Sequence, residues 1–120
     1  MKKMLIVEDD ILSQKLMTRN FKNDFEMDFC ESVEEYYEKY SNVNYDIIIM
    51  DISLKGIKSG LELIKEIKAV PSYPGTPILC LTAYAQTKMR QTAIESGTDL
   101  FITKPVPNKV LKGAVASLVK

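Results

Sequence analysis

Acidic residues directly follow two short apolar runs of the chain, and carboxylates in such places can do chemistry. Residues 8–10 are Glu-Asp-Asp and come after the apolar residues 4–7, while Asp51 comes after the Ile-Met run 47–50. Apolar runs without alternation are typical of strands that are buried on both faces. A carboxylate at the end of such a strand is costly to desolvate, so it should emerge into a polar site at the rim of a sheet.

The rest of the chain alternates between short apolar runs and segments with helical spacing. Residues 32–35, Ser-Val-Glu-Glu, have the form of a capping box, and the proline-rich stretch 71–77 is typical of a loop. Asp10 suits the N-terminus of the first helix, where an acid favours the helix dipole. We predict strands at 4–7, 25–29, 45–50, 78–81 and 100–103, and helices at 11–22, 33–40, 61–68, 84–95 and 107–119.

This order of elements predicts an α/β fold in which residues 1–120 form one domain. Helices should cover both faces of a five-stranded parallel sheet, as in the flavodoxin-like doubly wound (βα)5 three-layer sandwich with strand order 2-1-3-4-5. That order puts the alternating strand 25–29 at the edge and sets the first and third strands side by side. Ligands bind outside the carboxyl ends of the strands at this point, so Glu8, Asp9 and Asp51 should meet in one crevice.

Carboxylates that share a crevice repel one another unless a cation compensates their charge. The candidate ligands are oxygen atoms and the sequence has no histidine, so Mg²⁺ is the favoured ion, for which Mn²⁺ could substitute. Thr82 and Lys104 follow the fourth and fifth strands, where a hydroxyl and an ammonium could bind phosphoryl oxygens. The residues therefore outline a phosphoryl-transfer pocket.

Four motifs carry a resemblance that covers residues 3–118. LIVEDD, IIIMDISL, LTA and SGTDLFITKP, in this order and at these spacings, resemble the CheY-like receiver domains of response regulators in two-component signal transduction. The resemblance implies that Asp51 accepts a phosphoryl group from the phosphohistidine of a sensor histidine kinase or a histidine phosphotransfer protein. It also implies that Asp9 and Asp51 ligate Mg²⁺, with Glu8 acting through water and Ser53 through its backbone carbonyl.

The resemblance also implies roles for residues near the ends of the fourth and fifth strands. Thr82 would bond the phosphoryl group after it arrives, Lys104 would pair with it, and the Lys104–Pro105 peptide bond would be cis. Phe101 stands where the family keeps an aromatic residue whose burial is coupled to movement of Thr82. Phosphorylation would then switch the surface of the fourth helix, fifth strand and fifth helix for binding to a downstream protein, which the sequence does not identify.

Two positions tune the lifetime of the phosphoryl group in this family, and here they are Ser53 and Tyr84. Neither side chain is acidic or carries an amide, so no side chain orients an attacking water well. We therefore expect slow autodephosphorylation.

Other interpretations of these residues stay open at this stage. Phe101 could be an ordinary core residue, Thr82 a helix cap, and Lys104 an ammonium that extends to solvent from the sheet edge. The main functional alternative is a pseudo-receiver, an interaction module that takes no phosphate. A phosphatase of the haloacid-dehalogenase type would need an acid at Ser53, and a flavodoxin relative would need a Ser/Thr-rich phosphate loop at 8–10.

The composition limits the function classes further. Zero formal net charge argues against direct binding to nucleic acid, and the lack of histidine excludes a histidine general base and a Ser-His-Asp triad. The sequence shows neither a run of about 20 apolar residues nor a signal peptide, so we expect a cytoplasmic protein without membrane insertion. Cys30 and Cys80 are expected to be small buried hydrophobes.

For the assembly, we expect a monomer or a phosphorylation-dependent dimer. It should be a signalling phosphoacceptor that catalyses only its own phosphorylation and dephosphorylation. The domain would be either a stand-alone receiver or one taken from a longer protein.

Overall fold

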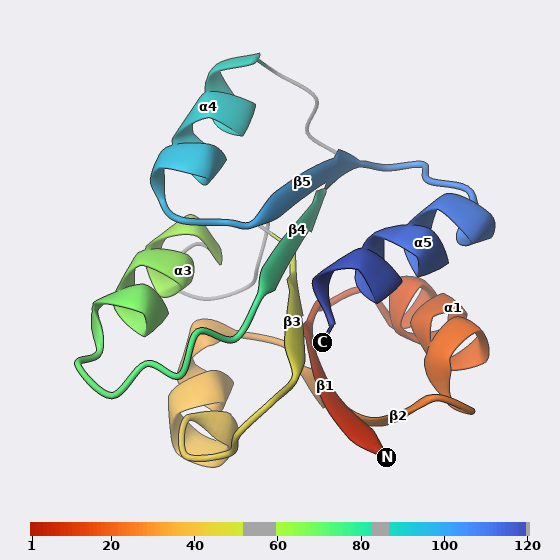
Figure 1. Ribbon diagram of the computed structural model, residues 1–120, viewed down its shortest axis with the longest axis horizontal. Coiled ribbons are helices and arrows are strands. Elements are labelled where there is room, and N and C mark those ends of the chain that lie inside the picture. Colours follow the sequence, from red (N-terminus) through yellow and green to blue (C-terminus); the bar gives the residue numbers. More distant parts are fainter. Residues whose placement is uncertain (52–59, 83–86, 120) are drawn as a thin grey trace.

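The computed structural model describes residues 1–51, 60–82 and 87–119, without the side chains of residues 82 and 87–90. Five parallel strands form one sheet in the order β2-β1-β3-β4-β5 (Figure 1), which confirms the predicted flavodoxin-like topology. The strands are β1 (Lys2–Val7), β2 (Phe25–Cys30), β3 (Ile47–Met50), β4 (Ile78–Thr82) and β5 (Leu100–Thr103).

Helices cover both faces of this sheet. They are α1 (Ile11–Phe21), α2 (Val33–Glu35) with its continuation η1 (Tyr36–Tyr40), α3 (Gly60–Ala69), α4 (Thr87–Glu95) and α5 (Asn108–Leu118). In Figure 1, α1 and α5 lie on one face of the sheet and α3 lies on the other. Ala93 of α4 packs against Cys80 and Phe101. No helix in the described part of the chain is long and apolar enough to span a membrane.

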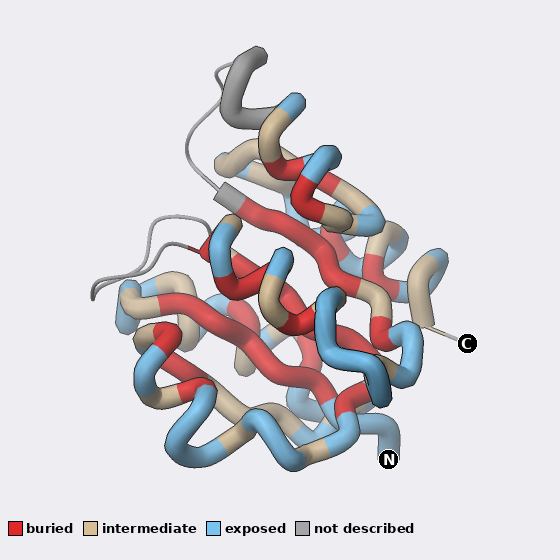
Figure 2. The backbone as a smooth tube through the Cα atoms, turned by 90° about the vertical axis from the view of Figure 1, so that its left-hand side faces the viewer, coloured by how far each residue is buried: buried red, intermediate tan, exposed pale blue. Residues whose placement is uncertain are grey.

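The central strands are buried on both sides because their alternate residues enter two different core clusters. Figure 2 shows these strands as the buried interior of the molecule. All four residues of β3 are buried, as its unbroken apolar sequence predicted. The cluster under α3 contains Leu5, Val7, Ile48, Met50, Leu63 and Ile64, and the cluster under α1 and α5 contains Met4, Ile6, Ile47, Ile49, Met17 and Leu111.

The first helix begins where the sequence places its cap. The Asp10 carboxylate accepts hydrogen bonds from the Ser13 hydroxyl at 2.8 Å and from the Ser13 backbone N–H at 3.0 Å. These two bonds lower the pKa of Asp10 below its ordinary value. Asp10 therefore serves helix α1.

The second helical segment differs from the prediction in its hydrogen bonding. Ser32 caps α2 by accepting from the Glu35 backbone N–H at 3.1 Å, whereas the Glu35 carboxylate accepts from Glu31, one residue before the expected partner. The predicted single helix ends at Tyr40, but its last five residues, Tyr36–Tyr40, form a π-helix. The side-chain pattern did not distinguish this wider turn from an α-helix.

Asp99 joins the starts of two neighbouring strands. Its carboxylate accepts from the Ile78 backbone N–H at 2.7 Å and from the Lys68 ammonium at 3.2 Å. Its own backbone N–H donates to the Ile78 carbonyl at 2.9 Å. The side chain thus satisfies a backbone donor at the point where β4 begins.

We predict that Asp99→Ala lowers the free energy of unfolding by about 1–3 kcal/mol, because the Ile78 N–H loses its acceptor. Lys68→Met is the matched control, since it removes only the partly exposed ion pair and should cost less than about 1 kcal/mol. Urea unfolding followed by circular dichroism measures both. Equal losses would mean that the ion pair, and not the backbone hydrogen bond, supplies the stability.

Candidate functional site

The carboxyl ends of β1 and β3 lie side by side and carry acidic residues into one place. Val7 and Met50 are partners in the sheet register, so Glu8 and Asp51 each follow a paired strand end. The backbone N–H of Asp51 donates to the Val7 carbonyl at 2.9 Å, and that of Glu8 donates to the Cys30 carbonyl at 2.8 Å. The sheet ladder therefore fixes both residues at the rim.

Lys104 bridges these two carboxylates from the end of β5. Its ammonium lies 2.6 Å from Glu8 Oε1 and 3.5 Å from Asp51 Oδ2. Burial alone would lower the pKa of Lys104, but the hydrogen bond to Glu8 and the negative charges of Glu8 and Asp51 outweigh it and raise that pKa. Lys104 is therefore a charged partner of the acids and not a side chain that extends to solvent.

The Lys104–Pro105 peptide bond is cis, as the resemblance implied.

The acidic side chains of the site differ in exposure. The Glu8 side chain is 6% exposed, whereas the Asp51 side chain is 12% exposed, so Asp51 is the more accessible of the two. Asp9 is half-buried. The second carboxylate oxygen of Glu8, Oε2, is buried and has no hydrogen-bond partner within the described residues.

A buried carboxylate oxygen without a partner calls for a water or a cation. The oxygen donors at this rim suit a hard ion such as Mg²⁺. The described residues contain no group of three acidic or sulfur side chains placed to hold a metal by themselves. Ser53, predicted to add a backbone carbonyl, lies outside the described residues.

The other predicted site residues are described to different extents. Thr82 ends β4 and is the register partner of Thr103, which precedes Lys104, so its backbone is at the same rim; its side chain is not described. Phe101 is buried beside Cys80 and Ala93 under α4. Tyr84 lies outside the described residues.

The first turn of α1 contributes two residues to the rim that the sequence did not single out. The Gln14 amide donates to the Glu8 carbonyl at 2.7 Å, and Ser13 Oγ lies 3.5 Å from the Lys104 ammonium. Both follow the Asp10 cap by one turn of helix, and that spacing was the signal that could have identified them.

Cys80 lies one strand away from this site but remains a hydrophobe. It is the register partner of Met50 in β3 and is fully buried. Burial, helped by the negative charge of Asp51, raises the pKa of its thiol to about 12. Cys30 is also free and buried, so the prediction for both cysteines is confirmed.

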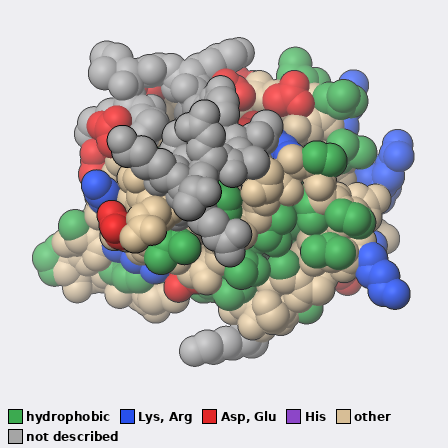
Figure 3. All heavy atoms as spheres, turned by 90° about the horizontal axis from the view of Figure 1, so that it is seen from above, with side chains coloured by type: hydrophobic (Ala, Val, Ile, Leu, Met, Phe, Trp, Pro, Cys, Tyr) green, Lys and Arg blue, Asp and Glu red, His purple; other side chains and the backbone are tan. Residues whose placement is uncertain are grey.

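An apolar surface adjoins the site. Figure 3 looks onto the end of the molecule where the strands finish, and hydrophobic side chains gather there on the side of α1 and α5. A groove between these helices begins at Lys104 and Pro105. Its apolar lining includes Leu16, Met17, Leu81, Val106 and Leu111.

The chain matches the model of one protein family over almost its whole length. Residues 4–116 match the response regulator receiver domain. Among curated relatives, the chemotaxis protein CheY of Halobacterium salinarum is 29% identical over 119 residues, which cover 98% of this chain and 97% of that protein. A hybrid signal transduction histidine kinase of Dictyostelium discoideum is 34% identical over 117 residues, covering 91% of this chain but 7% of the kinase.

Other relatives are also longer than this chain. It spans 28% of a cyclic di-GMP phosphodiesterase of Thermotoga maritima. It spans about half of two other relatives, 51% of the regulatory protein VanRB of Enterococcus faecalis and 48% of the transcriptional regulatory protein ResD of Bacillus subtilis. The similarity to each of those proteins is thus confined to one part of its length.

Solved structures share the fold. The signal receiver domain of a histidine kinase from Syntrophus aciditrophicus has a TM-score of 0.88 at 25% identity, covering 98% of this chain and 89% of that one. The receiver domain of the sensor histidine kinase PA1611 from Pseudomonas aeruginosa, with a magnesium ion in its active-site cleft, has a TM-score of 0.86 at 22% identity, covering 98% and 96%. Together with the family match, the fold and the rim of acids around Asp51 show that this chain belongs to the response regulator receiver family.

Proposed function

We propose that this domain is a phosphoacceptor and that Asp51 takes a phosphoryl group from the phosphohistidine of a sensor histidine kinase or a histidine phosphotransfer protein. The observation that carries the proposal is the position of Asp51, an accessible carboxylate at the end of a fully buried strand and beside a charged lysine. An Asp51 oxygen forms the new bond to phosphorus while the P–N bond breaks. The electron pair of the broken P–N bond stays on the imidazole nitrogen.

Lys104 would stabilise the product of this transfer. In the structure its ammonium is closer to Glu8, at 2.6 Å, than to Asp51, at 3.5 Å. A phosphoryl group on Asp51 adds negative charge there, which favours a shift of the ammonium toward the new oxygens. The Thr82 hydroxyl would bind another of these oxygens from the adjacent strand end.

The same rim would hold Mg²⁺, or Mn²⁺ in its place. Asp9 and Asp51 would ligate the ion, Glu8 would act through water, and Ser53 would provide its backbone carbonyl. A bound Mg²⁺ neutralises negative charge on the phosphoryl oxygens during transfer. The buried, unpartnered Oε2 of Glu8 supports this assignment, as does the magnesium in the cleft of the PA1611 receiver domain.

The output would be a change of surface and not catalysis on another molecule. Thr82 and Phe101 would couple the phosphoryl group to the surface of α4, β5 and α5, which would then bind a downstream protein. Phe101 of β5 packs in one cluster with Ala93 of α4, and this contact supports the proposed coupling. We further propose that the domain acts in the cytoplasm without binding nucleic acid itself, as a monomer or a phosphorylation-dependent dimer.

We predict that the protein gains the mass of one phosphoryl group when incubated with acetyl phosphate and Mg²⁺, and that Asp51→Asn gains none. Intact mass spectrometry of both proteins measures this. No gain by the wild type, from acetyl phosphate or from a phosphorylated histidine kinase, would favour the pseudo-receiver instead.

We predict that Glu8→Gln weakens Mg²⁺ binding by roughly 10- to 100-fold, the range usual for outer-shell residues of metal sites. The substitution keeps the shape of the side chain and an oxygen that can accept from Lys104. Backbone amide shifts of residues 7–10, 50 and 51 during a MgCl₂ titration report the affinity directly.

Asp10→Asn is the matched control for this titration. It removes the same charge two residues away, and asparagine still caps a helix. If both variants lost affinity equally, general electrostatics rather than a contact of Glu8 would explain the loss.

We predict that the phosphorylated protein loses its phosphoryl group slowly, because neither Ser53 nor Tyr84 presents an acid or an amide to orient water. Ser53→Asn should accelerate the loss by supplying such a group. Quenched time points of the intact mass give both rates. Loss from the wild type within seconds would contradict the prediction.

A further inference from the structure

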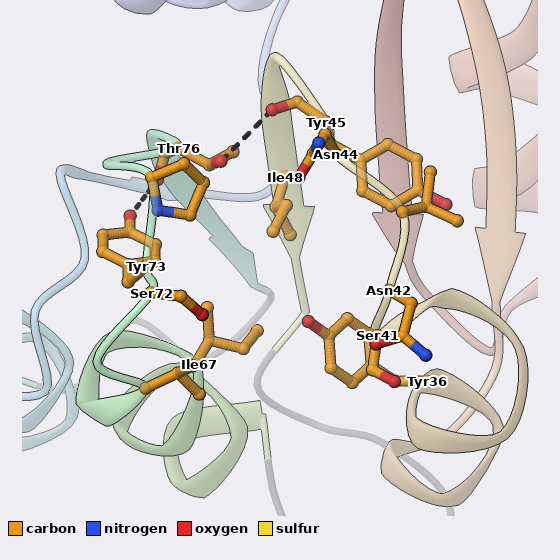
Figure 4. Close-up of a pocket in the computed structure, with 13 residues that line it drawn as sticks. Tyr36, Ser41, Asn42, Asn44, Tyr45, Ile48, Ile67, Ser72, Tyr73 and Thr76 are labelled. Carbon is orange, nitrogen blue, oxygen red and sulfur yellow. Dashed lines mark hydrogen bonds between the residues drawn. The ribbon is translucent and has the colours of Figure 1, made fainter.

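A second cavity lies at the opposite end of the sheet from Asp51, where β3 and β4 begin. It has a volume of about 240 Å³. Figure 4 shows residues of η1 and the turn after it, such as Tyr36 and Asn42, on one side, and residues at the end of α3 and in the loop after it, such as Ile67 and Tyr73, on the other. None of its thirteen lining residues is charged. The phosphoryl-transfer site that we propose uses none of them.

The cavity presents polar groups that the protein itself does not satisfy. Within the described residues, no hydrogen bond engages the hydroxyls of Tyr36 and Ser72 or the side-chain amides of Asn42 and Asn44. Tyr36 is only 8% exposed as a residue, and its hydroxyl keeps contact with solvent through the cavity, where a ligand can reach it. Burial raises the pKa of Tyr36, which keeps this hydroxyl protonated and able to donate.

The aromatic walls of the cavity are held in place. Tyr73 donates its hydroxyl to the Thr76 carbonyl, and the Lys68 ammonium lies 5.5 Å from the centre of its ring. The ring of Tyr36 packs edge-on against Tyr37 with centroids 5.2 Å apart. A preformed wall lowers the ordering cost of binding a ligand.

The backbone that carries Tyr36 is itself unusual. Tyr36 is the first residue of the π-helix η1, and short π-helical segments occur frequently at functional sites. The wall opposite is the proline-rich loop 71–77, whose Thr76 hydroxyl donates to the Tyr45 carbonyl at 3.2 Å. The conformations of both walls are thus set by local structure, the π-helix on one side and the hydrogen-bonded loop on the other, and not by the sheet.

We propose that this cavity binds an uncharged heteroaromatic molecule of about the size of a purine base. The lack of charged lining residues disfavours an ionic ligand, which would be desolvated without a partner. The rings of Tyr36 and Tyr73 and the side chains of Ile48 and Ile67 offer contact to an aromatic ring. The free hydroxyls and amides match donors and acceptors at the edge of a heterocycle, and the volume is below the usual range of about 300–1,000 Å³ for larger ligands.

Titration of the full chain with adenine, followed by backbone amide spectra, tests the proposal. Shifts should concentrate on residues 36, 41–45, 48, 72, 73, 75 and 76 and saturate. Two further probes define the ligand class: cyclohexanol, which is uncharged but not aromatic, and benzoate, which is aromatic but charged, should both bind at least several-fold more weakly. Absence of saturable shifts at these residues, or equal binding of all three probes, would overturn the proposal.

Variants locate the site and separate binding from folding. Tyr36→Phe keeps the ring and should weaken adenine binding roughly fivefold by removing one hydrogen bond. Ser72→Phe, at an exposed lining position, should abolish binding by filling the cavity. Tyr37→Phe, the matched control outside the cavity, should bind as the wild type does.

If Tyr36→Phe and Ser72→Phe both bound adenine with unchanged affinity, the cavity would not be the site. Phosphorylation by acetyl phosphate is measured on the same samples, so failure of this proposal and failure of the phosphoacceptor proposal are distinguishable.

Discussion

Carboxylates at the end of a buried strand must have their charge compensated nearby, and this requirement shapes one whole end of the molecule. Glu8 and Asp51 are held at the rim by backbone hydrogen bonds that belong to the sheet ladder, so neither can withdraw into solvent. Lys104 supplies one positive charge between two negative ones. An unpaired buried carboxylate would cost several kcal/mol, and the charge that Lys104 leaves uncompensated is what makes the rim suitable for a divalent cation.

The central strand can carry this charge because it is short, apolar and covered on both faces. Every residue of β3 is buried, with one set of side chains packed under α3 and the alternate set under α1 and α5. Close packing on both sides leaves the strand few ways to move. The same strand begins beside the cavity lined by Tyr36 and Tyr73 and ends at Asp51, so one rigid element runs between the two proposed sites.

Much of this arrangement was predictable from the sequence, and the misses have physical reasons. The strand order followed from the alternation of five strands with helices, which is typical of the flavodoxin-like class, and the apolar run in 47–50 and the alternation in 25–29 agreed with it. The meeting of Glu8 with Asp51 followed from that order. The π-helix could not be predicted, because Tyr36–Tyr40 would place similar side chains inward in an α-helix and in a π-helix. The tight pairing of Lys104 with Glu8 could not be predicted either, because it depends on side-chain conformations and not on the positions of strand ends.

Glu8 and Lys104 are 96 residues apart in the chain, and this separation has a consequence for protein synthesis. A chain that grows from its N-terminus carries Asp51 long before β5 and Lys104 leave the ribosome. Until then the two acids have no ammonium beside them, and the last strand of the sheet is missing. A truncated or half-made chain therefore lacks the ammonium that compensates Asp51, so the proposed phosphorylation would depend on completion of the fold.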